Sequence, residues 1–166
     1  KEFNAGFYCF DGGWLPGALK SLTPKNAQGE LYLTDTVGWL LSRGKKVSSV
    51  SSDTSEEVAG VNSLADLVFV RQILHERILM EHLENGVIIE DPATTFIDQG
   101  VTIGADTRIF PCTVIRTGVT IANGCEVGPF AHLRNGSEMQ EGSQIGNFVE
   151  VKNTLVGKGT KAKHLT

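Results

Sequence analysis

Every sixth residue between Ile97 and Val151 is aliphatic or methionine, and this strict period limits the folds open to the chain. An α-helix repeats every ~3.6 residues and a plain β-strand every two, so neither explains it. Because 40% of all residues are hydrophobic, the chance that ten positions spaced by six residues are all hydrophobic is roughly one in ten thousand. The positions are Ile97, Ile103, Ile109, Ile115, Ile121, Val127, Leu133, Met139, Ile145 and Val151. The period is that of a hexapeptide parallel β-helix.

A second set of small or β-branched residues lies two positions before each member of the first. Side chains alternate along a strand, so both sets point inward. Three six-residue segments close one triangular coil of about 18 residues, and stacked coils bury each other's apolar side chains. The second set is Thr95, Val101, Thr107, Thr113, Val119, Cys125, Ala131, Ser137, Ser143 and Val149.

The repeat shifts by one residue after Val151. The next position in register is Gly157, whereas the aliphatic residue comes one place earlier, at Val156. We therefore predict a bent corner or loop around residues 157–159.

Composition excludes some classes of function. A formal net charge of −4 argues against a general nucleic-acid binder. No apolar run has the length of a membrane span, and no secretory signal opens the sequence. Three cysteines without a spacing motif indicate reduced thiols and a cytoplasmic protein. The chain starts at Lys1 and stops at Thr166 within the repeats, so we expect an internal piece of a longer protein.

The rest of the sequence predicts an α/β part and a long helix. Residues 1–62 have strand patterns at 7–10 and 46–51 and helix patterns at 14–22 and from Thr34 or Asp35 to a C-terminal Gly44. Ser63 opens a capping box, and a helical period continues to Asn85 and Gly86. We predict a linker helix over 63–86 and the β-helix over 87–166; the alternative is that the helix belongs to the core of the first domain.

Four charged residues are spaced by one coil each, at Asp98, Arg116, Arg134 and Lys152. Residues one coil apart lie about 4.8 Å from each other. Neighbouring cations at this distance repel by roughly 0.8 kcal/mol even in water, and a bound phosphate or carboxylate would relieve that repulsion. The alternative is a solvated edge whose cations pair with Asp98 and Glu150.

Two histidines lie near this column of charges. His164 follows a basic run and is a candidate general base beside an anion site, because neutral imidazole titrates near neutral pH. His132 stacks under Glu150 by the 18-residue rule, which favours a surface contact over chemistry.

The motifs also resemble a known family. Residues 2–8, 26–35 and 60–62 resemble the distal half of a sugar-1-phosphate nucleotidyltransferase. Residues 128–134, 146–152 (GNFVEVK) and 157–166 (GKGTKAKHLT) resemble a hexapeptide acetyltransferase. Together, in this order, they resemble the bacterial bifunctional N-acetylglucosamine-1-phosphate uridyltransferase/glucosamine-1-phosphate acetyltransferases. The implied fold is a nucleotidyltransferase α/β part, a linker helix and a left-handed parallel β-helix.

This resemblance implies synthesis of UDP-N-acetylglucosamine, a precursor for peptidoglycan and lipopolysaccharide, by a homotrimer joined through the β-helix. The β-helix would transfer acetyl from acetyl-CoA to glucosamine-1-phosphate, and the α/β part would add UMP from UTP with Mg²⁺. Asn4 would contact the sugar nucleotide, and Asn62 would contact substrate and ligate Mg²⁺. Arg134 and Lys152 would hold the sugar phosphate, and His164 would deprotonate the amine.

Departures from the family pattern keep other interpretations open. The upstream nucleotide loop, a second magnesium-binding carboxylate, a tyrosine after His164 and the later coils lie outside this sequence, so we expect the piece alone to be inactive. Asn135 replaces a common proline, and Arg116 has no family role. The main alternative is a nucleotidyltransferase with a non-catalytic β-helix tail. A zinc enzyme of the γ-carbonic anhydrase type needs three histidines, whereas the repeats hold His132 and His164.

Overall fold

The structure, a computed structural model, describes residues 3–165. It forms two compact units, Lys1–Gly60 and Val61–Thr166, which are described separately. Glu2, in the first family motif, and Thr166, at the end of the last, lie outside the described residues.

The first unit contains the two helices expected from its sequence. These are α1 (Leu15–Lys20) and α2 (Asp35–Ser42), and a 3₁₀ helix, η1 (Ser55–Val58), follows them. Gly44 ends α2 with φ +70°, the left-handed conformation that favours glycine. Helices α1 and α2 approach closely because Gly17 has no side chain: a Cβ there would lie 3.0 Å from the Trp39 ring.

The two strands predicted for the first unit are wrong. Residues 7–10 and 46–51 have irregular backbone, and the side chain of Phe7 is 80% exposed. A strand needs a neighbouring strand to pair its backbone N–H and C=O groups. Within the described residues of this unit there is no other strand to provide that pairing, so apolar sequence alone did not produce a sheet.

The long helix α3 (Leu64–Glu84) lies in the second unit. The predicted capping box is confirmed, because Ser63 Oγ accepts from the Asp66 N–H and Asp66 Oδ2 accepts from the Ser63 N–H. Towards its C-terminal end Leu79 is buried against the β-helix core, and His75 stacks on Phe96 at 5.1 Å. Its role as a linker between two domains stays a prediction.

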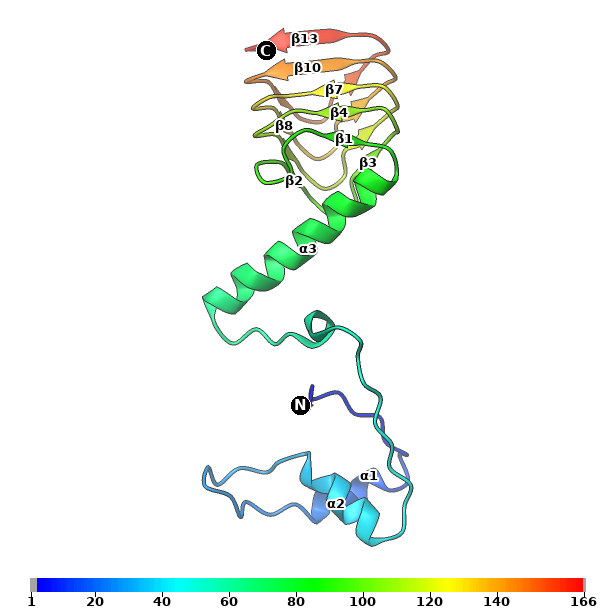
Figure 1. The fold of residues 1–166 in the computed structure, drawn as a ribbon, viewed down its shortest axis with the longest axis vertical. Coiled ribbons are helices and arrows are strands. Elements are labelled where there is room, and N and C mark those ends of the chain that lie inside the picture. The colour runs from blue at the N-terminus through cyan, green and yellow to red at the C-terminus, as the bar shows by residue number, and fades with distance from the viewer. Residues whose placement is uncertain (1–2, 166) are drawn as a thin grey trace. The chain divides into compact units, whose positions relative to one another are not determined.

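The β-helix follows α3 as stacked parallel rungs (Figure 1). Its strands form three sheets, one for each face of the prism. The first contains β1 (Ile88–Ile89), β4 (Arg108–Ile109), β7 (Glu126–Val127), β10 (Gln144–Asn147) and β13 (Lys161–His164). The second contains β2 (Phe96–Ile97), β5 (Val114–Ile115), β8 (His132–Leu133) and β11 (Glu150–Val151). The third contains β3 (Thr102–Ile103), β6 (Thr120–Ile121), β9 (Glu138–Met139) and β12 (Leu155–Val156).

The β-helix core confirms the six-residue pattern. Every member of the small or β-branched set is buried, and so is every member of the aliphatic set except Ile103, which is partly buried against the same core. The side chains of Ile109, Ile115 and Leu133 are 0% exposed. Each coil therefore contributes both sets to one continuous buried core, and five members of the small set, Thr95, Thr107, Thr113, Ser137 and Ser143, are polar.

The one-residue shift follows Val151, as predicted, but it does not lie in the corner predicted at residues 157–159. Val151 still pairs with Leu133, 18 residues before it, whereas Leu155 pairs with Glu138, 17 residues before it. The missing residue thus falls in the corner at 152–154, where Asn153 has φ +47°, and residues 157–159 lie after the shift. In the sequence the shift is visible only from Val156, the next aliphatic residue in the repeat. The corner at 152–154 contains no apolar residue that would show where the missing residue falls.

None of the helices formed by residues 3–165 combines the length and the apolar character required to cross a membrane.

Truncating a core side chain should destabilise the protein far more than truncating the same side chain on the surface. Leu133 is 0% exposed and Leu155 is 59% exposed. We expect Leu133→Ala to lower the free energy of unfolding by about 2–5 kcal/mol and Leu155→Ala to change it by about 0.5 kcal/mol. Chemical denaturation measures both; equal losses would contradict the assignment of inward and outward positions.

Candidate functional site

The second sheet lines up the predicted charge column. Ile97 pairs with Ile115, Ile115 with Leu133, and Leu133 with Val151. Each charged residue directly follows one of these strand residues, so Asp98, Arg116, Arg134 and Lys152 lie at the same edge of successive coils. The Arg134 N–H donates to the Val151 oxygen at 2.8 Å, which fixes Arg134 beside Lys152.

Two arginines of the column make ion pairs. Arg116 Nη1 lies 3.6 Å from Asp98 Oδ1, and Arg134 Nη1 donates to Glu150 Oε1 at 2.6 Å. Both ion pairs were predicted by the alternative interpretation, in which the column is a solvated edge whose cations pair with carboxylates. Within the part of the chain that the structure describes, Lys152 makes no ion pair. The column is therefore partly neutralised, and an anion would have to compete with Glu150 for Arg134.

The pair with Arg134 changes the acidity of Glu150. The hydrogen bond from Arg134 holds the pKa of this carboxyl below its ordinary value, with smaller contributions from the positive charges of Arg134, His132 and Lys152. A lowered pKa in the folded state means that the pair stabilises the fold above the unfolded pKa, and that this contribution is lost as pH falls through the lowered value.

His164 lies on a neighbouring face of the prism. It ends β13 on the first sheet, pairs in register with Asn147 and is exposed. Arg134 and Lys152 follow strands of the second sheet. Since residues 147–149 turn the corner between those two sheets, His164 borders the face that carries the cations.

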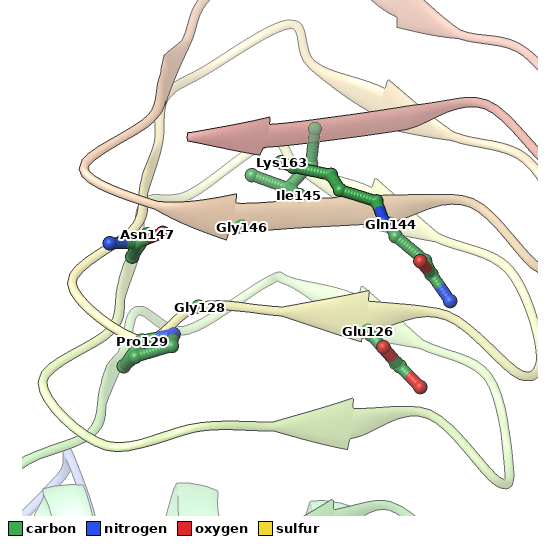
Figure 2. Close-up of a pocket in the computed structure, with 8 residues that line it drawn as sticks. All are labelled: Glu126, Gly128, Pro129, Gln144, Ile145, Gly146, Asn147 and Lys163. Atoms are coloured by element: carbon green, nitrogen blue, oxygen red, sulfur yellow. The ribbon is translucent and has the colours of Figure 1, made fainter. Parts of the chain in front are cut away.

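A small hollow opens on the first sheet beside His164. Figure 2 shows the Glu126 and Gln144 side chains pointing the same way from β7 and β10. The volume of the hollow is about 230 Å³. This is smaller than the roughly 300–1,000 Å³ of sites that enclose a drug-sized ligand. The lining residues are Glu126, Gly128, Pro129, Gln144, Ile145, Gly146, Asn147 and Lys163.

The corner between the first and second sheets carries an exposed aromatic pair that the sequence analysis missed. Phe130 and Phe148 stack with ring centroids 5.2 Å apart, and they are 52% and 58% exposed. Both have φ +56°, an uncommon conformation for a bulky residue. Their spacing of one coil was a signal that could have identified the pair.

The residues predicted to serve uridylyl transfer lie in different units. Asn4 is in the first unit, where its side-chain amide donates to Tyr8 and, at 3.4 Å, to Thr34. Asn62 is in the second unit, just before α3, and its N–H donates to Asp66 Oδ2 at 3.0 Å. Nothing in the structure of either unit brings Asn4 and Asn62 together.

The surroundings of Asn62 do not form a magnesium site by themselves. The described residues contain no group of three His, Cys, Asp or Glu side chains placed to hold a metal ion. The nearby carboxylate of Asp66 is engaged by the capping box, and its hydrogen bond with Ser63 holds its pKa below the ordinary value. The residues present therefore do not fit Mg²⁺ without further ligands.

Removing Arg134 should raise the pKa of Glu150. We expect Arg134→Gln to return this pKa towards its ordinary value, because the dominant hydrogen bond is lost. NMR titration of the Glu150 carboxyl measures the change. Arg108→Gln, which removes the partner of Glu90 instead, is the matched control and should leave the Glu150 titration unaltered. An unaltered pKa in Arg134→Gln would mean that the pair does not persist in solution.

Comparisons with known proteins agree with this fold. The bacterial transferase hexapeptide family (six repeats) matches residues 100–135. Proteins called "Bifunctional protein GlmU" are similar to the chain: that of Acetivibrio thermocellus is 46% identical over 115 residues, and those of Clostridium beijerinckii and a Geobacillus species are both 47% identical over 115 residues. Each match covers 69% of this chain and 25% of the relative.

The chain thus spans about a quarter of the length of the curated relatives it matches. The resemblance predicted from its motifs is confirmed by these relatives, and the predicted left-handed β-helix agrees with the parallel rungs and the hexapeptide match. The chain carries bacterial transferase hexapeptide repeats over residues 100–135 and is similar to the bifunctional GlmU proteins over 115 residues.

Proposed function

We propose that the protein containing this chain transfers an acetyl group from acetyl-CoA to the amine of glucosamine-1-phosphate. Arg134 and Lys152 bind the phosphate, and His164 is the general base. The amine attacks the thioester carbonyl, His164 accepts the proton that the amine loses, and the thiolate of coenzyme A leaves. The amide bond of N-acetylglucosamine-1-phosphate forms as the carbon–sulfur bond breaks.

One observation carries this proposal: Arg134 and Lys152 occupy the same position in adjacent coils of a transferase-type β-helix. The guanidinium of Arg134 matches two phosphate oxygens, and Lys152 adds a point charge. Lys152 makes no ion pair within residues 3–165, which leaves its charge available to an anion.

The position of His164 is compatible with the same substrate. In register it lies over Asn147, five residues before Lys152. At about 3.3 Å per residue, that stretch is at most roughly 16 Å long. Two long side chains with a hexosamine phosphate between them can bridge such a span. A general base must lie within hydrogen-bonding distance of the group that it deprotonates. A sugar bound by its phosphate at Arg134 would bring its amine within that distance of His164.

The other implied functions are supported by the resemblance alone. We infer that the whole protein also forms UDP-N-acetylglucosamine from UTP and N-acetylglucosamine-1-phosphate, using Asn4 for the sugar nucleotide and Asn62 for substrate and Mg²⁺. We further infer a cytoplasmic homotrimer joined through the β-helix, with acetyl-CoA bound partly by residues outside this sequence. The exposed pair Phe130 and Phe148 is an apolar surface that such association would cover.

A nucleotidyltransferase with a non-catalytic β-helix tail remains the second candidate. The ion pairs Arg116–Asp98 and Arg134–Glu150 favour this candidate, because they neutralise two cations of the charge column without a bound ligand. This candidate predicts no catalytic use of His164, so the two proposals differ in the following experiment.

Replacing His164 should remove one activity and spare the other. In the full-length protein we expect His164→Ala to lower kcat for acetyl transfer by about 10²–10⁴ and to leave uridylyl transfer unchanged. Steady-state assays of both reactions test this. Lys158→Ala is the control in the same coil, because Lys158 is exposed and pairs with Glu141. Loss of both activities, or of neither, would refute the role of His164.

Replacing the column cations should weaken binding of the sugar phosphate. We expect Arg134→Ala and Lys152→Ala each to raise Kd for glucosamine-1-phosphate about ten- to hundredfold, since each removes a charge-assisted hydrogen bond worth roughly 1.5–3 kcal/mol. Arg116→Ala is the control, because it removes a cation from the same column that is paired with Asp98. Titration calorimetry measures Kd; equal effects of all three substitutions would indicate general attraction rather than a site.

A further inference from the structure

His132 has an unsatisfied nitrogen next to the anion column. It pairs in register with Val114 on one side and Glu150 on the other. Its Nε2 is buried and has no hydrogen-bond partner in the described structure. A buried polar atom without a partner costs free energy and calls for an explanation. Of its two register neighbours, Glu150 is the one that carries an acceptor.

Glu150 is currently engaged by Arg134. The 2.6 Å pair neutralises the arginine that the proposed function assigns to phosphate. A phosphate bound to Arg134 would displace Glu150 and leave two anions side by side, which is unfavourable unless a new positive charge compensates. The Arg134 and Glu150 side chains are 42% and 55% exposed, so neither is locked in place by packing.

The charged groups around His132 come from three strands. Glu150 and Lys152 belong to β11 and the corner after it, Arg134 follows β8, and Arg116 follows β5. Glu150 is the one anion among them. If Glu150 left Arg134 and turned towards the imidazole, its carboxylate would favour the charged form of that imidazole.

We propose that His132 is a positioning residue that takes over Glu150 when an anion occupies Arg134 and Lys152. The imidazole gains one proton from solvent, and its Nε2–H donates to the Glu150 carboxylate that Arg134 has released. This exchange rests on the anion site of the proposed function and adds to it a coupling between anion binding and protonation.

Sulfate is a suitable probe, because it is doubly charged and does not titrate near neutral pH. If the exchange occurs, the full-length protein takes up close to one proton per sulfate bound wherever the imidazole is neutral in the anion-free protein. Sulfate affinity then rises by up to about tenfold for each unit that pH falls in that range. Calorimetric titration in buffers of different ionisation enthalpy counts the protons.

Two substitutions isolate the exchange. His132→Gln removes the titrating group, and Glu150→Gln removes the negative charge at an exposed position, so a folding defect is not expected there. Both should abolish proton uptake, and sulfate affinity in His132→Gln should become nearly independent of pH. Proton uptake that persists in His132→Gln, or that is lost only in His164→Gln, would overturn the proposal.

The anion site is tested separately in the same titrations. Sulfate that does not bind, or that binds Arg134→Ala as tightly as the unaltered protein, would refute the phosphate site together with the exchange that rests on it. Sulfate binding that requires Arg134 but takes up no proton would refute the exchange alone.

Discussion

Parallel backbone hydrogen bonds between successive coils determine the arrangement of the β-helix in the second unit. The Arg116 N–H donates to Leu133 O, and the Arg134 N–H donates to Val151 O, each at 2.8 Å. These bonds hold residues one coil apart at the strand spacing of about 4.8 Å. Every coil then repeats the same inward and outward positions. The core, the charge column and the aromatic pair all follow from that register.

The same register both creates and limits the candidate site. It brings Arg134 beside Lys152, and it also brings His132 beside Glu150. A phosphate site built in this way is not preformed, because Glu150 holds Arg134 before any anion arrives. Anion binding at Arg134 would therefore require an exchange of partners at the surface. Groups that are about half exposed can make such an exchange without disturbing the buried core.

The sequence predicted the β-helix well because its signal is local and repeated. Inward positions such as Ile115 and Cys125 are decided by burial, and burial is what a six-residue pattern reports. The strand at residues 7–10 was wrong for the opposite reason. Its apolar residues needed partner strands, and a single segment cannot report whether partners exist. The shift after Val151 was assigned to the corner at 157–159, one corner too late, because the shortened corner at 152–154 contains no apolar residue.

The site was predictable as a column but not as a set of contacts. The 18-residue spacing gave the neighbours of Arg134, including the alternative pairing with Glu150. It could not decide between a bound anion and an ion pair, because both satisfy the same charges. It also missed the hollow lined by Gly128 and Gly146. The roles of Asn4 and Asn62 came from resemblance, and neither unit's geometry adds to them.

An experimental structure of the full-length protein with glucosamine-1-phosphate is the most direct test of this account. We predict that the phosphate lies against Arg134 and Lys152 in adjacent coils, with Glu150 turned away from Arg134 and the sugar amine facing His164. A phosphate bound on another face, or Arg134 and Lys152 on different faces of the coil, would contradict it.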